Sequence, residues 1–321
     1  MLYNANNIME KKKHHYVWRD YLRSWSSGEY VFTYSKNQNK IFTSNLMGVA
    51  MEKYFYALDE FTLEEEINLK EVVKSCSNET VVELNLELYE SFIIYSKILR
   101  FKKENAFVID SETKQEKLDK ITKLIKSNLF EEFHTIIENY GSRIIKIKKF
   151  EEIRMFDDED NLFFLMIFLC SQFLRTKKMK KKLELMCEKN ELIIPKFINI
   201  ISLVFANSLA VSLADNKDVR YVFYENKTDL NFITSDQPLM NLKFNDKDES
   251  GKVIEFEFYY PINTRIAILI HLKNQENKYD HIFIDKKNVK ELNDHIYHYA
   301  DDHVFAKTKN QLEEYMSKEK S

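Results

Sequence analysis

The sequence predicts an α+β protein in which a helical middle layer packs with a mostly antiparallel sheet. Residues 62–216 repeat their apolar side chains at helical spacing. After Lys217, short runs rich in Val, Ile, Phe and Tyr are separated by turn residues, which is typical of antiparallel strands. Only 4 Gly and 3 Pro occur in 321 residues, and this favours long helices joined by polar turns.

The N-terminal part, residues 14–61, is predicted to be mixed. From Tyr16 to about Trp25 the apolar residues fall at helical spacing and form one stripe on a short helix. The following stretch, EYVFTYSK, alternates polar and apolar residues and predicts a strand. This strand leads into KIFTSNLMGVAMEKYFYAL, and we expect the N-terminal strands to join the C-terminal sheet.

The helical region shows clear start and stop signals. Thr62 precedes an acidic first turn and is a predicted cap, and Asn78 or Thr80 caps the next helix. The stretch from Ser111 to Gly141 is expected to hold two further helices, with Ser111 as cap and Gly141 as stop. Two later segments, DEDNLFFLMIFLC and the segment that begins at Pro195, are apolar nearly all round, which predicts the buried centre of the helical layer.

The C-terminal third is predicted to supply the sheet. Its strand candidates are VRYVFYEN, NFITSDQPLM, GKVIEFEFYYPI, RIAILIHLK and DHIFID, followed by a helix over KKNVKELNDHIYHYA, a short strand HVFAK and a frayed tail. The length allows two domain-sized units or one large one. We expect one α+β unit over 1–321, composed of 14–61, 62–216, 217–308 and the tail 309–321.

Composition narrows the function classes. Lys and Arg number 48 against 51 Asp and Glu, for a net charge of −3, so any site for a nucleic acid or another anion must be local. The three cysteines are odd in number and far apart, which predicts reduced thiols in a cytoplasmic protein. The longest apolar run, residues 162–170, is about half of a membrane-spanning length, and the N-terminus lacks a signal-peptide pattern, so no membrane role is expected.

The stretch NFITSDQP contains the first candidate for chemistry. A strand over Asn231–Ile233 is expected to run into Thr234, Ser235 and Asp236 before Pro238 ends it, so that Asp236 lies at the exposed end of the sheet. A carboxylate held there can act as a general base or bind a divalent ion such as Mg²⁺. The alternative is an Asx-turn, in which Asp236 only bonds the local backbone.

Two other polar groups each allow two interpretations. The run RTKKMKKKLE carries six cations in eight residues and could contact a phosphate backbone, but it could equally be the solvated end of a helix. The stretch NDHIYHYADDH places His295 and His298 one turn apart beside several aspartates, as a metal site requires. It could also be an ordinary polar helix end.

The opening stretch HHYVWRDYLRSW and the later TSDQP together resemble a family of uncharacterised bacterial proteins, one of the numbered domains of unknown function. That family begins with a pattern like H-H-Y-V-P-x-F-Y-L-R-x-F, later carries T-S-D-N-P, and closes with a short fVyS pattern. The departures are Trp18 in place of Pro, Asp20 in place of an aromatic residue and Ala306 in place of Ser. The matching residues are His14, His15, Tyr16, Val17, Leu22, Arg23, Thr234, Ser235, Asp236 and Pro238.

The resemblance also suggests a geometry for the opening stretch. A family Pro at position 18 implies that HHYV is extended and that the helix begins just after it. His14 and His15 then point to opposite faces, so only one of them can line a site. Arg19 and Arg23 share a helix face, and an imidazole beside two guanidinium groups suits a phosphate or carboxylate.

We therefore expect a nuclease or a related phosphoryl-transfer hydrolase, and the family resemblance suggests a toxin-like or phage-defence effector. One of the two histidines would act as general acid or base, arginine would hold the phosphate, and Asp236 would orient the histidine or bind a divalent ion. Nucleic acid or a nucleotide is the expected partner. The candidate catalytic residues are His14, His15, Arg23 and Asp236, and the candidate substrate-binding residues are Tyr16, Arg19, Thr234 and Ser235.

A second hypothesis from a different class is a non-catalytic sensor or binding module. In that case a buried hydrogen bond between His15 and Asp236 would pin the N-terminal segment to the C-terminal sheet. The aromatic and basic N-terminal surface would then contact the partner. Binding of a small nucleotide without hydrolysis is a third possibility.

Overall fold

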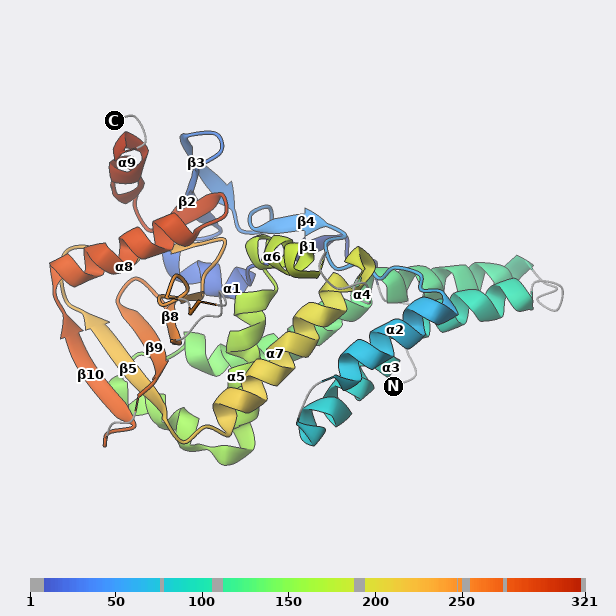
Figure 1. The fold of residues 1–321 in the computed structure, drawn as a ribbon. Coiled ribbons are helices and arrows are strands. Elements are labelled where there is room, and N and C mark those ends of the chain that lie inside the picture. Colours follow the sequence, from blue (N-terminus) through green and yellow to red (C-terminus); the bar gives the residue numbers. More distant parts are fainter. Residues whose placement is uncertain are drawn as a thin grey trace. The chain divides into compact units, whose positions relative to one another are not determined.

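The computed structural model describes residues 9–75, 78–105, 112–187, 194–246, 248–249, 255–273 and 276–318. The α+β class is confirmed, with 55% helix and 19% strand (Figure 1). The chain forms two compact units, each assembled from three separate stretches. The helical unit consists of Met1–His14, Glu52–Ile137 and Lys180–Ser208, and the sheet unit of His15–Met51, Glu138–Met179 and Leu209–Ser321. The single unit expected from the sequence, and its segment boundaries, stay predictions.

The helical unit contains α2 (Leu63–Lys74), α3 (Glu79–Glu104) and the part of α4 (Glu112–Ile145) up to Ile137. Thr62 caps α2 as predicted, because its hydroxyl accepts from the Glu65 N–H while the Glu65 carboxylate accepts from the Thr62 N–H. Asn78 caps α3 through its side-chain oxygen. The cap predicted at Ser111 lies outside the described residues.

The most apolar segments are buried, as predicted. Helix α5 (Glu159–Leu174) belongs to the sheet unit and is buried along its whole second half. Helices α6 (Lys177–Cys187) and α7 (Ile198–Ala214) run from one unit into the other, and α7 follows the short 3₁₀ turn η3 (Pro195–Phe197). The stretch Pro195–Ala214 is apolar enough to cross a membrane, but it is 67% buried, as the core helix of a globular protein also would be.

A five-stranded sheet lies entirely within the C-terminal third. Its order is β10-β5-β9-β8-β7, and every pair is antiparallel except β10 with β5, which is parallel. The short 3₁₀ segment η2 (Phe150–Asp157) packs on β5, where Phe156 stacks on Tyr221. The strands are β5 (Val219–Asn226), β7 (Met240–Asn241), β8 (Glu257–Pro261), β9 (Ile266–Leu272) and β10 (Tyr279–Ile284).

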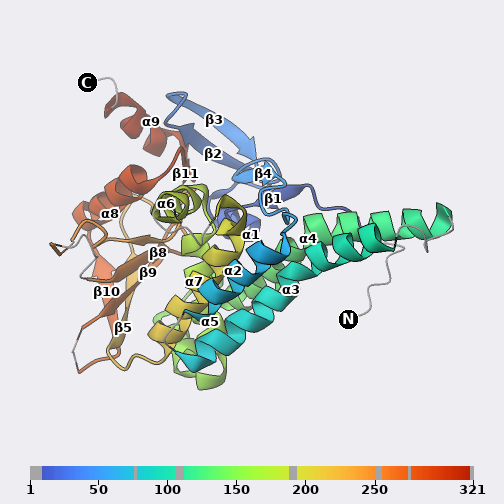
Figure 2. The same cartoon turned by 45° about the vertical axis from the view of Figure 1, so that its right-hand side comes forward.

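The N-terminal strands join C-terminal strands in a second sheet of order β3-β2-β11-β6. Figure 2 shows β2 beside β11, with α9 (Lys309–Lys318) close to β3. A further two-stranded sheet pairs β1 (Lys13–His15) with β4 (Met51–Lys53). The strands of the second sheet are β2 (Tyr30–Ser35), β3 (Lys40–Asn45), β6 (Thr234–Ser235) and β11 (His303–Ala306).

Four predictions about local structure need correction. The tail is a helix, α9, because Leu312 is fully buried and Tyr315 stacks on Tyr297. The strand expected at Asn231–Ile233 begins instead at Thr234. Residues 16 and 17 form a bend and Trp18 is extended, so the helical part is limited to α1 (Arg19–Leu22) and the 3₁₀ turn η1 (Arg23–Trp25). The stretch expected to hold two helices forms one, α4, and Gly141 does not end it, since α4 continues to Ile145.

Gly141 is required for packing. A Cβ atom at this position would lie 2.1 Å from Cδ2 of Phe168, whose fully buried ring belongs to α5. In an exposed helix Gly→Ala would stabilise by about 1 kcal/mol. We predict that Gly141→Ala instead lowers the free energy of unfolding by about 2 kcal/mol, because overpacking of a dense core is costly. Urea unfolding checks this, with Gly48→Ala as the control, since its nearest atom is 3.7 Å away.

Candidate functional site

Asp236 is a buried carboxylate held by backbone amides. Its side chain accepts hydrogen bonds of 2.8 Å from the N–H groups of Asp301, Asp302 and His303. Its own N–H donates to the carbonyl of His303 at 2.9 Å. The exposed position predicted for Asp236 is therefore wrong: only 4% of the residue is accessible, because the segment that enters β11 covers it.

The surroundings of Asp236 favour a structural anchor. Burial raises the pKa of Asp236, while the three amides and the nearby His303 act in the opposite direction. The carboxylate bonds the backbone, as in the Asx-turn alternative, but the amides lie 65 to 67 residues further along the chain. The local turn is formed by Ser235, whose hydroxyl accepts from the Gln237 N–H and donates to the Gln237 carbonyl.

The N-terminal motif and the TSDQP segment meet through Tyr21 and Thr234. Their buried hydroxyls are 2.7 Å apart, and the Tyr21 hydroxyl donates to the carbonyl of Pro261 at 2.8 Å. Trp25 donates from its indole nitrogen to the carbonyl of Phe232. The two predicted motifs are thus brought together, but by side chains that lock the fold, and Thr234 and Ser235 are fully buried.

Two lysines lie beside Asp236, at the C-terminal end of α8 (Lys286–Tyr299). Lys36 donates to the carbonyls of Tyr297 and Ala300 at 3.3 and 3.4 Å. Lys178 donates to the carbonyl of Tyr299, and its Nζ lies 4.2 Å from the centre of the Tyr299 ring. Terminal carbonyls of a helix attract cations, so the two lysines stabilise this helix end.

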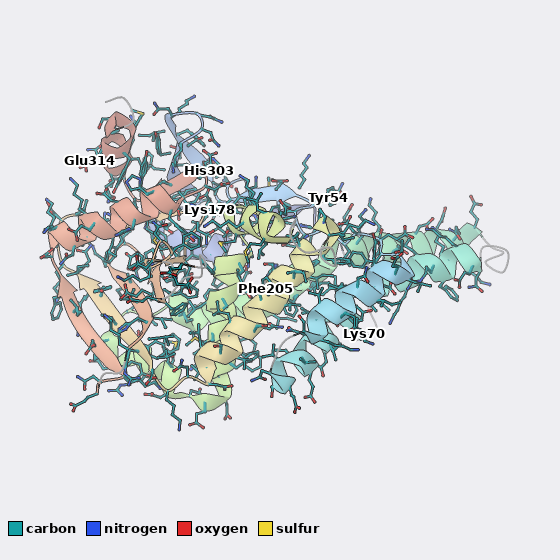
Figure 3. The ribbon with its side chains drawn as sticks, in the orientation of Figure 1. Tyr54, Lys70, Lys178, Phe205, His303 and Glu314 are labelled. Atoms are coloured by element: carbon teal, nitrogen blue, oxygen red, sulfur yellow. The ribbon has the colours of Figure 1, made fainter. Side chains whose placement is uncertain are left out.

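Lys178 has a lowered pKa. Burial lowers its pKa, and the charge of Lys36 lowers it further, while Asp236 and Asp301 raise it. Figure 3 labels Lys178 and His303 close to the end of α8. We call Lys36, Lys178, Asp236, Asp302 and His303 the Asp236 junction.

Asp302 connects the junction to the second sheet. Its carboxylate accepts from the Ser35 hydroxyl at 2.9 Å and from the Asn37 N–H at 3.0 Å, and it lies 3.3 Å from Nε2 of His303. Burial acts to raise the pKa of Asp302, but these hydrogen bonds and the His303 charge hold it below its ordinary value. Asp302 is therefore an ionised, backbone-bonded carboxylate that joins the start of β11 to the end of β2.

His14 and His15 differ in their environments. His14 is fully buried, its Nε2 lies 3.0 Å from the carbonyl of Lys11, and its Nδ1 accepts from the Tyr56 N–H at 2.8 Å. Burial lowers the pKa of His14. His15 is half-buried and belongs to the sheet unit, where its backbone carbonyl accepts from Arg175 at 2.6 Å. The catalytic roles of both histidines stay predictions.

The remaining N-terminal candidates also have internal partners. Arg23 pairs with Glu29 and with Asp20, and the Asp20 contact is 2.9 Å. Arg19 donates to Sδ of Met47 at 2.6 Å. Tyr16 is 3% accessible, and Lys177 lies over its ring at 5.1 Å. A phosphate at this surface would compete with two carboxylates for Arg23.

No group of three or more His, Cys, Asp or Glu side chains within the described part of the chain is arranged to hold a metal ion, and this includes the surroundings of Asp236. Part of the basic run has structural contacts, since buried Arg175 pairs with Glu138 at 2.7 Å. The site residues predicted from the sequence do not include Lys36, Lys178 or Tyr21. The basic run that contains Lys178 and the ADDH stretch were the signals that could have indicated the junction.

The chain is thus a mixed α+β protein with a polar structural centre. At this centre a buried carboxylate accepts from distant backbone amides and lies next to two lysines at a helix end. The model of the family described as "Protein of unknown function (DUF4238)" matches residues 13–310, so the chain belongs to this family. No curated protein matches the chain. No solved structure matches it either.

We predict that Asp236→Asn lowers the free energy of unfolding by about 3 kcal/mol, because the amide NH₂ would face backbone N–H donors and leave buried groups unsatisfied. Chemical unfolding followed by circular dichroism measures this. Asp20→Asn is the matched control, since Asp20 makes an exposed ion pair worth at most about 1 kcal/mol. Equal effects of the two substitutions would contradict the structural role of Asp236.

His14 should make stability depend on pH. Its folded-state pKa is below the ordinary value of 6.5, so its contribution is complete above pH 6.5 and is lost as pH falls towards the folded-state pKa. We predict that the wild-type protein loses more unfolding free energy between pH 8 and pH 5 than His14→Asn, which keeps an acceptor for Tyr56 but does not titrate. Exposed His295→Asn should behave like the wild type.

Proposed function

We propose that this chain is a non-catalytic binding module in which the His14 and Asp236 motifs are structural. The observation that carries the proposal is the Asp236 carboxylate, which is buried and accepts three backbone hydrogen bonds. A general base needs a lone pair directed at the substrate, and a metal ligand needs one directed at the ion. Here three of the roughly four lone-pair positions of the carboxylate are directed at N–H groups of the chain itself.

The contacts of the other predicted catalytic residues agree with this proposal. Both ring nitrogens of His14 lie within hydrogen-bond distance of backbone groups, so a proton transfer to substrate would break a buried contact. Arg23 is neutralised by Asp20 and Glu29. The aromatic rings of the N-terminal motif are mostly buried, so the partner surface is placed elsewhere in this proposal.

Nucleic acid or a nucleotide is the partner class that we propose, within a toxin-like or phage-defence role in the bacterial cytoplasm. Support comes from α6, in which five of the first six residues are lysines. Lys178 and Lys180 are half-buried, and burial lowers the pKa of Lys180. Lys181 is the most exposed of this group in the described helix, so it is the first residue to test.

A second candidate, a phosphoryl-transfer hydrolase, is favoured by one observation. Lys178 is half-buried, has a lowered pKa, and lies in a group with Asp302 and His303. Perturbed titratable groups gather at active sites, although structural ion networks perturb pKa values too. In this candidate Lys178 would neutralise charge on a phosphoryl group and His303 would transfer a proton.

One set of assays separates the two candidates. We predict that micromolar protein, with or without Mg²⁺ or Mn²⁺, does not turn over RNA, DNA or nucleotides. It should bind a fluorescent RNA or single-stranded DNA with an affinity that falls steeply as salt rises. The double variant Lys181→Glu with Lys182→Glu should weaken binding about tenfold, because it removes two of the positive charges that would neutralise phosphates.

The control is Lys287→Glu with Lys290→Glu, which reverses two exposed lysines on α8 and should leave the affinity unchanged. Turnover that disappears in Lys178→Met while the melting temperature stays constant would refute the binding module and support the hydrolase. Equal affinity in the α6 double variant and the wild type would refute α6 as the nucleic-acid surface.

A further inference from the structure

Strand β10 forms one edge of the five-stranded sheet. It pairs with β5 alone, and no other strand of the described residues pairs with its outer side (Figure 1). His281 is exposed, as are Ile282 (42% accessible) and Phe283 (58% accessible). The middle of this edge therefore presents apolar and aromatic side chains to solvent.

The backbone of β10 also presents free hydrogen-bonding groups outward. Tyr221 N–H donates to the carbonyl of Lys278, and the parallel register pairs Tyr279 with Tyr221. In a parallel ladder this pattern directs the polar groups of every second residue, here 280 and 282, towards β5. The N–H and C=O groups of Tyr279, His281 and Phe283 consequently point away from the sheet.

The edge has little of the usual protection against pairing, with Asp280 as the one acidic residue of the strand. Exposed edge strands are commonly guarded by lysine, proline, a bulge or a covering segment. The sequence of β10, YDHIFI, contains no lysine, proline or glycine. An unguarded apolar edge is a template for another strand.

Three of the charges or titratable groups around this edge have partners within the chain. Lys278 pairs with Asp157 at 2.7 Å, and Lys286 pairs with Asp229 at 2.8 Å. His281 lies 2.9 Å from Glu225. Asp280 adds one negative charge within the strand itself, and Lys227 lies 3.9 Å from the centre of the Phe283 ring. The other exposed side chains of the strand are apolar or aromatic.

We propose that the occupant of this edge is a second copy of the chain, with the two β10 strands antiparallel about a two-fold axis at Ile282. His281 then lies opposite Phe283 of the partner subunit, and Ile282 lies opposite its own copy. Because residues 281 and 283 point outward in both strands, they form the hydrogen-bonded pairs, and Ile282 forms a non-hydrogen-bonded pair with Cα atoms about 4.5 Å apart.

The side-chain pairs support this register. Aromatic residues opposite one another, and a β-branched residue opposite its like, are favourable cross-strand pairs. A register centred one residue earlier would place His281 opposite itself, and protonation would then bring two positive charges together. Pairing of two edge strands alone buries less accessible surface than a standard stable interface, which buries about 1,600 Å². A reversible, concentration-dependent dimer is therefore expected.

Sedimentation velocity of the full chain, at concentrations between about 5 and 200 μM, tests for this weak dimer. The wild type should shift from monomer to dimer with concentration. Two variants should stay monomeric. Phe283→Lys places a charge in each cross-strand pair of residues 281 and 283, and His281→Pro removes an outward N–H. Leu272→Lys is the matched control, because Leu272 is 40% accessible at the end of the interior strand β9. A monomeric wild type at 200 μM, or a dimer unaffected by Phe283→Lys, would overturn the proposal.

A cysteine at the two-fold axis tests the register. Ile282→Cys should give a disulfide-linked dimer under mild oxidation, and peptide mapping should locate the bond at position 282 of both copies, apart from the native cysteines. Asp280→Cys should not crosslink to itself, because it lies opposite Ile284 of the partner subunit. Absence of a 282–282 bond would overturn the two-fold pairing.

Discussion

Three backbone amides converge on the buried carboxylate of Asp236, and the architecture of the sheet unit depends on this contact. A charged carboxylate without donors would be costly to bury, and three backbone N–H groups without acceptors would be costly as well. Each group therefore needs the other. The contact fastens the end of β6 to the start of β11, and β11 in turn carries the N-terminal hairpin of β2 and β3.

The neighbouring charges complete an internally balanced group. Lys36 and Lys178 bind the terminal carbonyls of α8, where the helix dipole favours cations. Asp302 accepts from Ser35 and Asn37, so the turn after β2 is tied to the same point as the end of α8. Perturbed pKa values here follow from burial and ion pairing, and such networks resemble active sites electrostatically even where their role is structural.

The residues of the N-terminal motif also have internal partners. Tyr21, Leu22 and Trp25 are fully buried, and the hydroxyl of Tyr21 bridges Thr234 and the Pro261 carbonyl. Its arginines lie on the surface with carboxylates of the same segment. A motif can therefore look reactive because it combines histidine, arginine and aromatic residues, while its physical role is to fasten remote parts of one sheet unit.

Local features were predictable because they depend on neighbours in the sequence. Thr62 and Glu65 form a capping box three residues apart, the alternation in EYVFTYSK became β2, and the apolar segments became buried helices. The opposite faces of His14 and His15 also follow from extended backbone. These features require no knowledge of the tertiary structure.

The sequence by itself determined the α+β class, the start of α2 and α3, and the strand character of the C-terminal third. The tertiary structure decided the burial of Asp236, since the covering amides come from residues more than sixty positions away. It also decided that Gly141 admits the ring of Phe168 where a helix stop was expected, and that β10 is an open edge. Local propensity sets which elements form, whereas contacts between distant segments set which polar groups remain available for function.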